Sequence, residues 1–136
     1  MDSGNGVIDD DNQSIYGSAL MELVKQFVSA HKDSIDEKRI YVGGLSNGGF
    51  MTCRLIADNP GFFAAGIACC APWNDDLASD METKNLAGTP IWFVHADDDP
   101  LVLADKQHCL RITVCLRQAL RTFTSHTTIM CKIELV

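Results

Sequence analysis

Residues 39–51 read RIYVGGLSNGGFM, and this stretch decides the fold. The apolar run at positions 40–42 is typical of a buried strand, and a helical stretch follows from Asn47. Ser46 therefore lies at a sharp turn, with Gly44 and Gly48 two residues to either side. We expect both glycines to be required, because side chains there would obstruct a backbone that folds back so tightly. The turn also directs backbone N–H groups toward the helix N-terminus, where an anion is stabilised.

Strands alternate with helices along most of the chain. The patterns predict helices over residues 14–31, 47–58, 80–86 and 104–121, and strands over 39–43, 64–71, 90–95 and 127–136. The first helix carries one apolar stripe that includes Leu20, Val24 and Phe27. Apolar strands that alternate with helices are typical of a parallel sheet covered on both faces. The predicted fold is therefore a three-layer α/β/α sandwich with a mainly parallel sheet.

The charge is unevenly distributed. The net charge of −7 argues against a nucleic acid or an anionic membrane as a partner. Residues 1–105 hold 6 Lys or Arg against 17 Asp or Glu, whereas residues 106–136 hold 5 against 1. We therefore divide the chain into a flexible acidic segment over residues 1–13 and a domain over 14–136, of which 106–136 is an atypical tail.

The chain is short for the predicted fold. Its 136 residues fall below the roughly 200 that a complete sheet with its crossover helices needs, so we expect a partial domain, from truncation or a shifted reading frame. Exposed strand edges would then favour self-association. No signal peptide or membrane span is recognisable, which predicts a cytoplasmic protein, or a secreted one if its true N-terminus is missing. Three cysteines in apolar runs are predicted to be buried thiols: Cys53, Cys69 and Cys70.

Two segments together resemble a known superfamily. Residues 44–48 fit G-x-S-x-G, the nucleophile elbow of α/β-hydrolases. Residues 35–51 resemble esterases of the polyhydroxybutyrate-depolymerase and feruloyl-esterase group, and are similar to prolyl-oligopeptidase-type hydrolases. Residues 89–102 resemble the superfamily's strand followed by H-G-x-x-D-x-x-V, with Ala96 in place of the usual glycine. The resemblance covers about residues 14–103 and implies a partial α/β-hydrolase fold.

The resemblance also implies roles for particular residues. Ser46 would attack the carbonyl of a small-molecule or polymeric carboxylic ester and form an acyl-enzyme, without a cofactor. Asp99 would be the acid of the triad, and the Asn47 N–H one oxyanion donor. Trp73, in the loop after the second strand, would line the substrate pocket.

Alternatives stay open at each level. The chain could be a prolyl-oligopeptidase-type peptidase, a catalytically inactive remnant or a binding domain; a flavodoxin-like domain shares the strand–helix pattern but does not explain G-x-S-x-G. Ser46 could be an ordinary turn residue, residues 97–99 a solvated turn, and Trp73 a packing residue. A calcium site at the three aspartates is disfavoured, because no loop has the spacing of metal ligands.

The base of the triad is the least defined element. Four histidines are candidates: His31, His95, His108 and His126. His31 ends a predicted helix, and His108 lies within another. His95 lies where the resemblance implies a structural histidine, four residues before the acid. His126 follows Asp99 in the chain order of the superfamily and is our candidate base. A parallel last strand would nevertheless begin roughly 26 Å from the active edge.

Overall fold

The structure is a computed structural model that describes residues 12–96, 98–102 and 128–132. Within these ranges, helices alternate with strands up to the last strand, as the sequence predicts. The elements in chain order are α1 Gly17–Ala30, the 3-10 turn Glu37–Arg39, β1 Tyr41–Leu45, α2 Asn47–Asp58, β2 Ala65–Cys69, α3 Asp80–Ala87, β3 Ile91–Ala96 and β4 Thr128–Lys132. The predicted helix over 104–121 lies outside the described residues.

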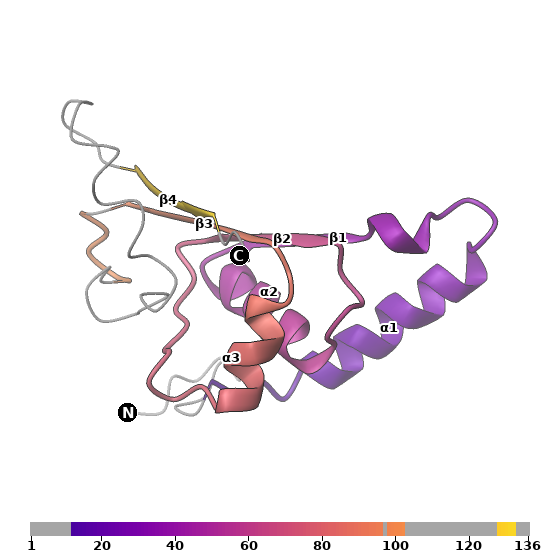
Figure 1. Cartoon of the computed structure of the whole chain (residues 1–136), viewed down its shortest axis with the longest axis horizontal. Coiled ribbons are helices and arrows are strands. Elements are labelled where there is room, and N and C mark those ends of the chain that lie inside the picture. Colours follow the sequence, from indigo (N-terminus) through magenta and orange to yellow (C-terminus); the bar gives the residue numbers. More distant parts are fainter. Residues whose placement is uncertain (1–11, 97, 103–127, 133–136) are drawn as a thin grey trace.

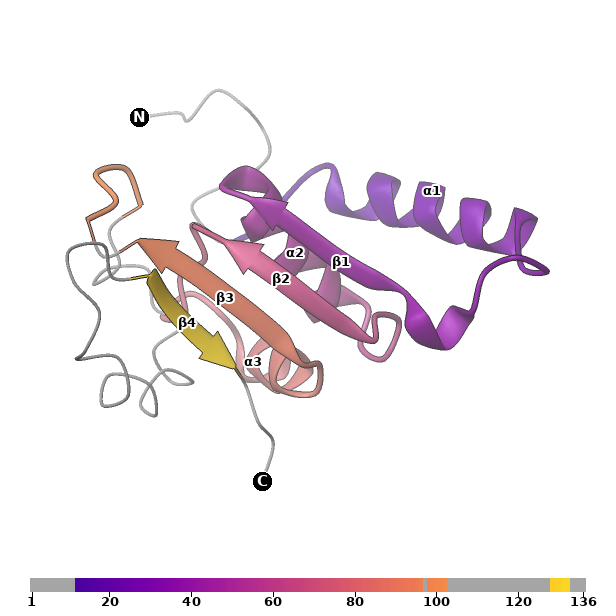
Figure 2. The same cartoon turned by 90° about the horizontal axis from the view of Figure 1, so that it is seen from above.

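The strands form one sheet in the order β1-β2-β3-β4 (Figure 2). β1 pairs in parallel with β2, and β2 in parallel with β3, so the carboxyl ends of these three strands meet at one edge. β4 instead runs antiparallel to β3, with Thr128 opposite Ala96. The mainly parallel sheet confirms the predicted α/β class and the partial α/β-hydrolase fold. The assumption that the last strand runs parallel to the others is wrong.

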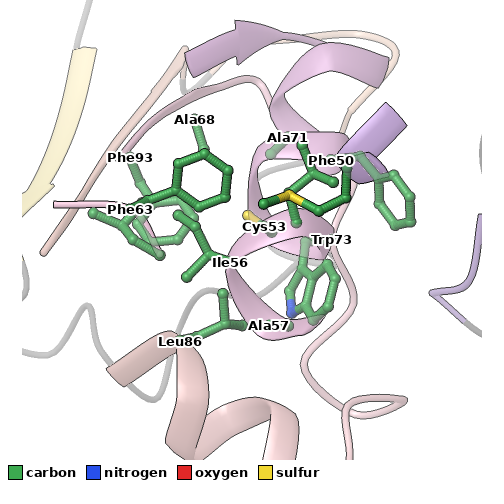
Figure 3. Close-up of a cluster of buried hydrophobic side chains, with 13 residues drawn as sticks. Phe50, Cys53, Ile56, Ala57, Phe63, Ala68, Ala71, Trp73, Leu86 and Phe93 are labelled. Atoms are coloured by element: carbon green, nitrogen blue, oxygen red, sulfur yellow. The ribbon is translucent and has the colours of Figure 1, made fainter. Parts of the chain in front are cut away.

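The helices α2 and α3 pack on the same face of the sheet (Figure 1). Almost every side chain of α2 from Phe50 to Ala57 is buried, because the helix lies between the sheet and its neighbouring helices. Its Ile56 packs over Gly66 of β2, where an added Cβ would come within 2.8 Å of Ile56 Cδ1. The core between α2 and the sheet is shown in Figure 3 and includes Phe50, Cys53, Ile56, Phe63, Ala68, Ala71, Trp73, Ile91 and Phe93.

Among the described residues, no helix covers the opposite face of the sheet. Tyr41, Leu45, Ile67 and Trp92 are between 45% and 67% exposed, and the strand register places them on this face. The described residues therefore show two of the three predicted layers, the sheet and the helices on one side of it. Self-association of the chain through this apolar face stays a prediction.

The N-terminal part differs from expectation in two places. Leu23 and Phe27 of the predicted apolar stripe are more than half exposed, and the buried apolar side chain of α1 is Met21, which lies outside that stripe. Asn12, which the sequence places in a flexible segment, is buried and exchanges side-chain hydrogen bonds with the backbone of Asn74. None of the helices in the described ranges is long and apolar enough to cross a membrane.

Candidate active site

Ser46 lies between β1 and α2 in a strained backbone conformation. Its φ of 55° and ψ of −117° place a non-glycine residue in the left-handed half of the conformational map. The N–H of Ser46 donates to Cys69 O at 2.9 Å. Its carbonyl accepts from Phe50 N–H at 2.9 Å, and this is the hydrogen bond with which α2 begins. These bonds fix the backbone while the residue remains exposed at the carboxyl edge of the sheet.

The close approach at this turn requires glycine at two positions. A Cβ on Gly44 would lie 2.3 Å from the carbonyl carbon of Gly48, and one on Gly49 would lie 2.6 Å from Cys69 O. A Cβ on Gly48 would meet nothing within 4 Å. The prediction that glycine is required is therefore correct for Gly44 and wrong for Gly48. The backbone of Gly48 lies against Gly44, but a side chain on Gly48 would point into open space. The need for Gly49 follows from the packing of α2 on β2.

A matched pair of variants tests this assignment. Gly44→Ala should destabilise the fold by about 2–3 kcal/mol, because the new methyl group meets backbone that a side-chain rotation cannot relieve. Gly48→Ala, in the first turn of α2, should leave the free energy of unfolding unchanged or raise it by about 0.5–1 kcal/mol. Urea unfolding of both variants provides the comparison. Equal destabilisation would contradict the assignment.

Asn47 is the first residue of α2 and is exposed beside Ser46. The N–H groups of a helix's first turn have no acceptor within the helix, and they lie at the positive end of its dipole. The Asn47 N–H is therefore a donor that an oxyanion formed next to Ser46 can use, as the sequence suggests.

Asp99 lies in the loop after β3, at the same edge of the sheet. Its Oδ1 accepts hydrogen bonds from the N–H groups of Leu101 and Val102, at 2.9 and 3.0 Å. The Val102 and Leu101 N–H groups lower the pKa of Asp99, and the Cys70 thiol lowers it further. Asp98 is exposed, and Asp97 lies outside the described residues. The fixed, ionised carboxylate of Asp99 makes it the best candidate acid in the described part of the chain.

The two described histidines have other partners. His31 caps α1, with Nδ1 2.8 Å from Phe27 O and its ring stacked on Phe27. His95 Nε2 lies 2.6 Å from Val102 O and 3.9 Å from Asp99 Oδ2, so this ring braces the loop that carries Asp99. His108 and His126 lie outside the described residues. Because β4 is antiparallel and Thr128 faces Ala96, β4 begins at the edge where Ser46 lies, which removes the distance argument against His126.

Trp73 lies in the core and not in a pocket. Its side chain is 1% exposed and packs against Phe50, with 5.8 Å between ring centroids (Figure 3). The guanidinium carbon of Arg54 lies 5.6 Å from the centre of the Trp73 ring, within cation–π distance. The packing interpretation therefore applies to Trp73, and its predicted contact with a substrate does not fit this arrangement.

An ion network is centred on Arg54 of α2. Arg54 of α2 is 3% exposed, donates to both oxygens of Asp58 and lies 2.6 Å from Glu82 Oε1. Burial opposes the charge of Arg54, but hydrogen bonds with Asp58 and Glu82 outweigh this effect and raise its pKa. Ser79 and Glu82 also form a capping box at the start of α3. The network therefore joins α2 to α3.

The ion pair predicts a loss of stability in acid. Burial raises the pKa of Glu82, but hydrogen bonds from Ser79 and Arg54 lower it from 4.5 to about 2. Because the folded value is the lower one, this stabilisation is complete above about pH 4.5 and is lost as the pH falls toward about 2. Between those limits, the free energy of unfolding should fall by on the order of 2 kcal/mol more in the wild type than in Glu82→Gln. Equal acid sensitivity in urea titrations would contradict the assignment.

Among the described residues, no group of three or more His, Cys, Asp or Glu side chains is placed to hold a metal ion. The functional groups described at this edge are a serine at a strained turn, a helix N-terminus and an anchored carboxylate.

Comparisons with known proteins agree with this geometry. Residues 18–99, more than half of the chain, match the prolyl oligopeptidase family. A solved structure, described as that of a thermostable esterase, shares 32% sequence identity with the chain at a TM-score of 0.55. The alignment covers 65% of this chain and 22% of the esterase chain, so this chain spans about a fifth of the esterase's length. Comparison with curated proteins gave no match.

Proposed function

The chain belongs to the prolyl oligopeptidase family of α/β-hydrolases, and from this premise we propose that it is a serine hydrolase acting on carboxylic esters through Ser46. The observation that carries the proposal is the conformation of Ser46, which is exposed on a strained turn between a parallel strand and a helix N-terminus. A nucleophile in this position can approach an acyl group from the open side of the turn.

Each step of the proposed reaction uses a residue at this edge. Ser46 Oγ attacks the carbonyl carbon and passes its proton to a histidine. The Asn47 N–H stabilises the resulting oxyanion, and Asp99 holds the histidine in the required tautomer. The protonated histidine then gives its proton to the departing alcohol, and water releases the acyl group from Ser46 by the reverse sequence of proton transfers.

We assign the role of base to His126. The order Ser46, Asp99, His126 matches the chain order of nucleophile, acid and base in α/β-hydrolases. The antiparallel β4 begins with Thr128 opposite Ala96, at the carboxyl end of β3, and this supports the assignment. His95 is a weaker candidate, because it precedes Asp99 in the chain and its Nε2 lies 2.6 Å from Val102 O.

Two observations bear on the class of substrate. The sequence around Ser46 resembles the depolymerase and feruloyl-esterase group, and the similar solved structure is described as an esterase. The family match, by contrast, carries the name of a peptidase. We therefore propose esters as the preferred substrates and proline-containing peptides as the alternative. Turnover of p-nitrophenyl butyrate, compared with that of a prolyl p-nitroanilide, decides between them.

Two variants test the proton-transfer residues. Asp99→Asn and His126→Gln should each lower the kcat of p-nitrophenyl butyrate hydrolysis by about 10³- to 10⁴-fold, because the base is then misoriented or absent. His31→Gln, a change at the exposed end of α1, should retain wild-type turnover. Wild-type turnover in His126→Gln would show that another group is the base.

The second candidate function is a binding domain without catalysis. It is favoured by the engagement of both described histidines in contacts other than Ser46. A folded wild-type chain that hydrolyses neither the ester nor the anilide would support this function over the proposed one. Circular dichroism of the same sample would establish that the chain is folded.

A further inference from the structure

The loop after β3 orients Asp99 through bonds to its own backbone. The Asp99 N–H donates to Ala96 O at 3.2 Å, and Asp99 Oδ1 accepts from the N–H groups of Leu101 and Val102 at 2.9 and 3.0 Å. All three bonds are local, because each joins residues within one turn of the same loop. They fix the carboxylate relative to the loop, but they do not attach the far end of the loop, at Val102, to the sheet.

The side chain of His95 makes that attachment. Its Nε2 lies 2.6 Å from Val102 O, and both residues are at least partly buried. The backbone of β3 beside the ring is held from both sides, because Val94 O accepts the Cys70 N–H at 2.8 Å and β4 pairs along the other edge of β3. The His95 ring therefore connects a fixed part of the sheet to the residue whose N–H binds the Asp99 carboxylate.

The same distances define which ring nitrogen of His95 carries a proton. A carbonyl oxygen only accepts hydrogen bonds, so Nε2 carries the proton that is donated to Val102 O. Asp99 Oδ2 lies 3.9 Å from this nitrogen, beyond hydrogen-bond distance. The base of a Ser-His-Asp triad instead donates directly to the acid and uses its other nitrogen to take the serine proton. The contacts of His95 Nε2 therefore fit support of the loop and not the role of base.

We propose that His95 is a positioning residue, whose Nε2–H holds Val102 so that the Val102 N–H keeps the Asp99 carboxylate in the orientation that the catalytic base requires. This inference rests on the proposed role of Asp99 as the acid of a triad. Without the bond from His95, the loop could shift with its internal hydrogen bonds intact. The carboxylate would then be displaced although the fold persists.

Two substitutions separate the donor of His95 from the bulk of its ring. His95→Phe keeps an aromatic ring without a donor and should lower the kcat of p-nitrophenyl butyrate hydrolysis by about 10- to 100-fold, with KM little changed, because a displaced acid misplaces the base. His95→Gln retains an N–H donor at a similar reach and should restore most of the lost kcat. Wild-type turnover in His95→Phe would overturn the inference, as would a glutamine variant that is no more active than the phenylalanine variant.

A core variant at the opposite end of β3 controls for lost stability. Ile91→Val removes one buried methyl group away from the loop, so it should lower the free energy of unfolding and leave kcat at the wild-type value. A kcat that falls in Ile91→Val and His95→Phe in proportion to their loss of stability would show that His95 acts only through the fold, against the inference.

A further readout does not depend on turnover. Correlation of ¹H and ¹⁵N in the histidine rings of the wild type identifies the protonated nitrogen, and the signals missing in His95→Gln assign those of His95. The neutral His95 ring should carry its proton on Nε2, and a proton on Nδ1 would overturn the contact with Val102. A wild type without turnover would refute the proposed function and, with it, the positioning role, whereas wild-type turnover in His95→Phe would refute this inference alone.

Discussion

Ser46→Ala is expected to lower the turnover of p-nitrophenyl butyrate by on the order of 10⁴-fold, because the acyl-enzyme route requires the hydroxyl. The fold should be unaffected, since the backbone bonds of Ser46 to Cys69 and Phe50 do not involve its side chain. The measurement compares kcat/KM with the free energy of unfolding for the same preparation. A variant that retains turnover would show that the ester is cleaved elsewhere.

Ser46→Gly separates activity from stability at the same position. Glycine adopts a φ of 55° without a steric penalty, so this variant should be inactive and yet more stable than Ser46→Ala, by about 1 kcal/mol. Such a gain would show that the strained backbone at residue 46 lowers stability, and that its benefit is the placement of the Ser46 hydroxyl. A less stable glycine variant would argue that the conformation is not strained.

Arg54→Ala should produce the largest loss of stability, about 3–5 kcal/mol, because it leaves the partly buried Glu82 carboxylate without its cation and opens a cavity against Trp73. Arg54 is 3% exposed, and one of its NH groups also donates to Asn12 O at 3.1 Å, so its loss affects three segments at once. Thermal or urea unfolding measures the effect.

Asp58→Asn is the control for this prediction. The side chain of Asp58 is 46% exposed, so the loss of its charge should cost about 1 kcal/mol or less. Arg54→Ala and Asp58→Asn remove different ends of the same pair, but only the first removes the cation that Glu82 also uses, whereas Asp58→Asn leaves Arg54 paired with Glu82. Equal destabilisation would contradict the view that the network is held together by the buried guanidinium.

The sequence predicts the elements around Ser46 well, because their signals are local. The bounds of α2 match the prediction, since Ser46 starts the turn and Asn59 and Pro60 follow the last residue of the helix. Asp99 is predicted from a short motif, and the structure adds a reason for preferring it to Asp98, namely the bonds from Leu101 and Val102.

Features that depend on tertiary packing were beyond the sequence patterns. Alternating apolar residues indicate a strand at 128–132 but carry no information on its direction, which determines the edge where it begins. Arg54 reads as an ordinary helical cation, because its partner Glu82 lies 28 residues away. The need for Gly49 likewise arises from contact with Cys69 and Ala71 across the fold, and not from the G-x-S-x-G spacing.

The most direct test of the central claim is covalent labelling by a fluorophosphonate, which reacts with a serine only where the hydroxyl is activated. The folded chain should gain one adduct, located on Ser46 by peptide mass spectrometry, and the urea-unfolded chain should gain none. A folded chain that remains unlabelled, or that carries its adduct on another residue, would contradict the account.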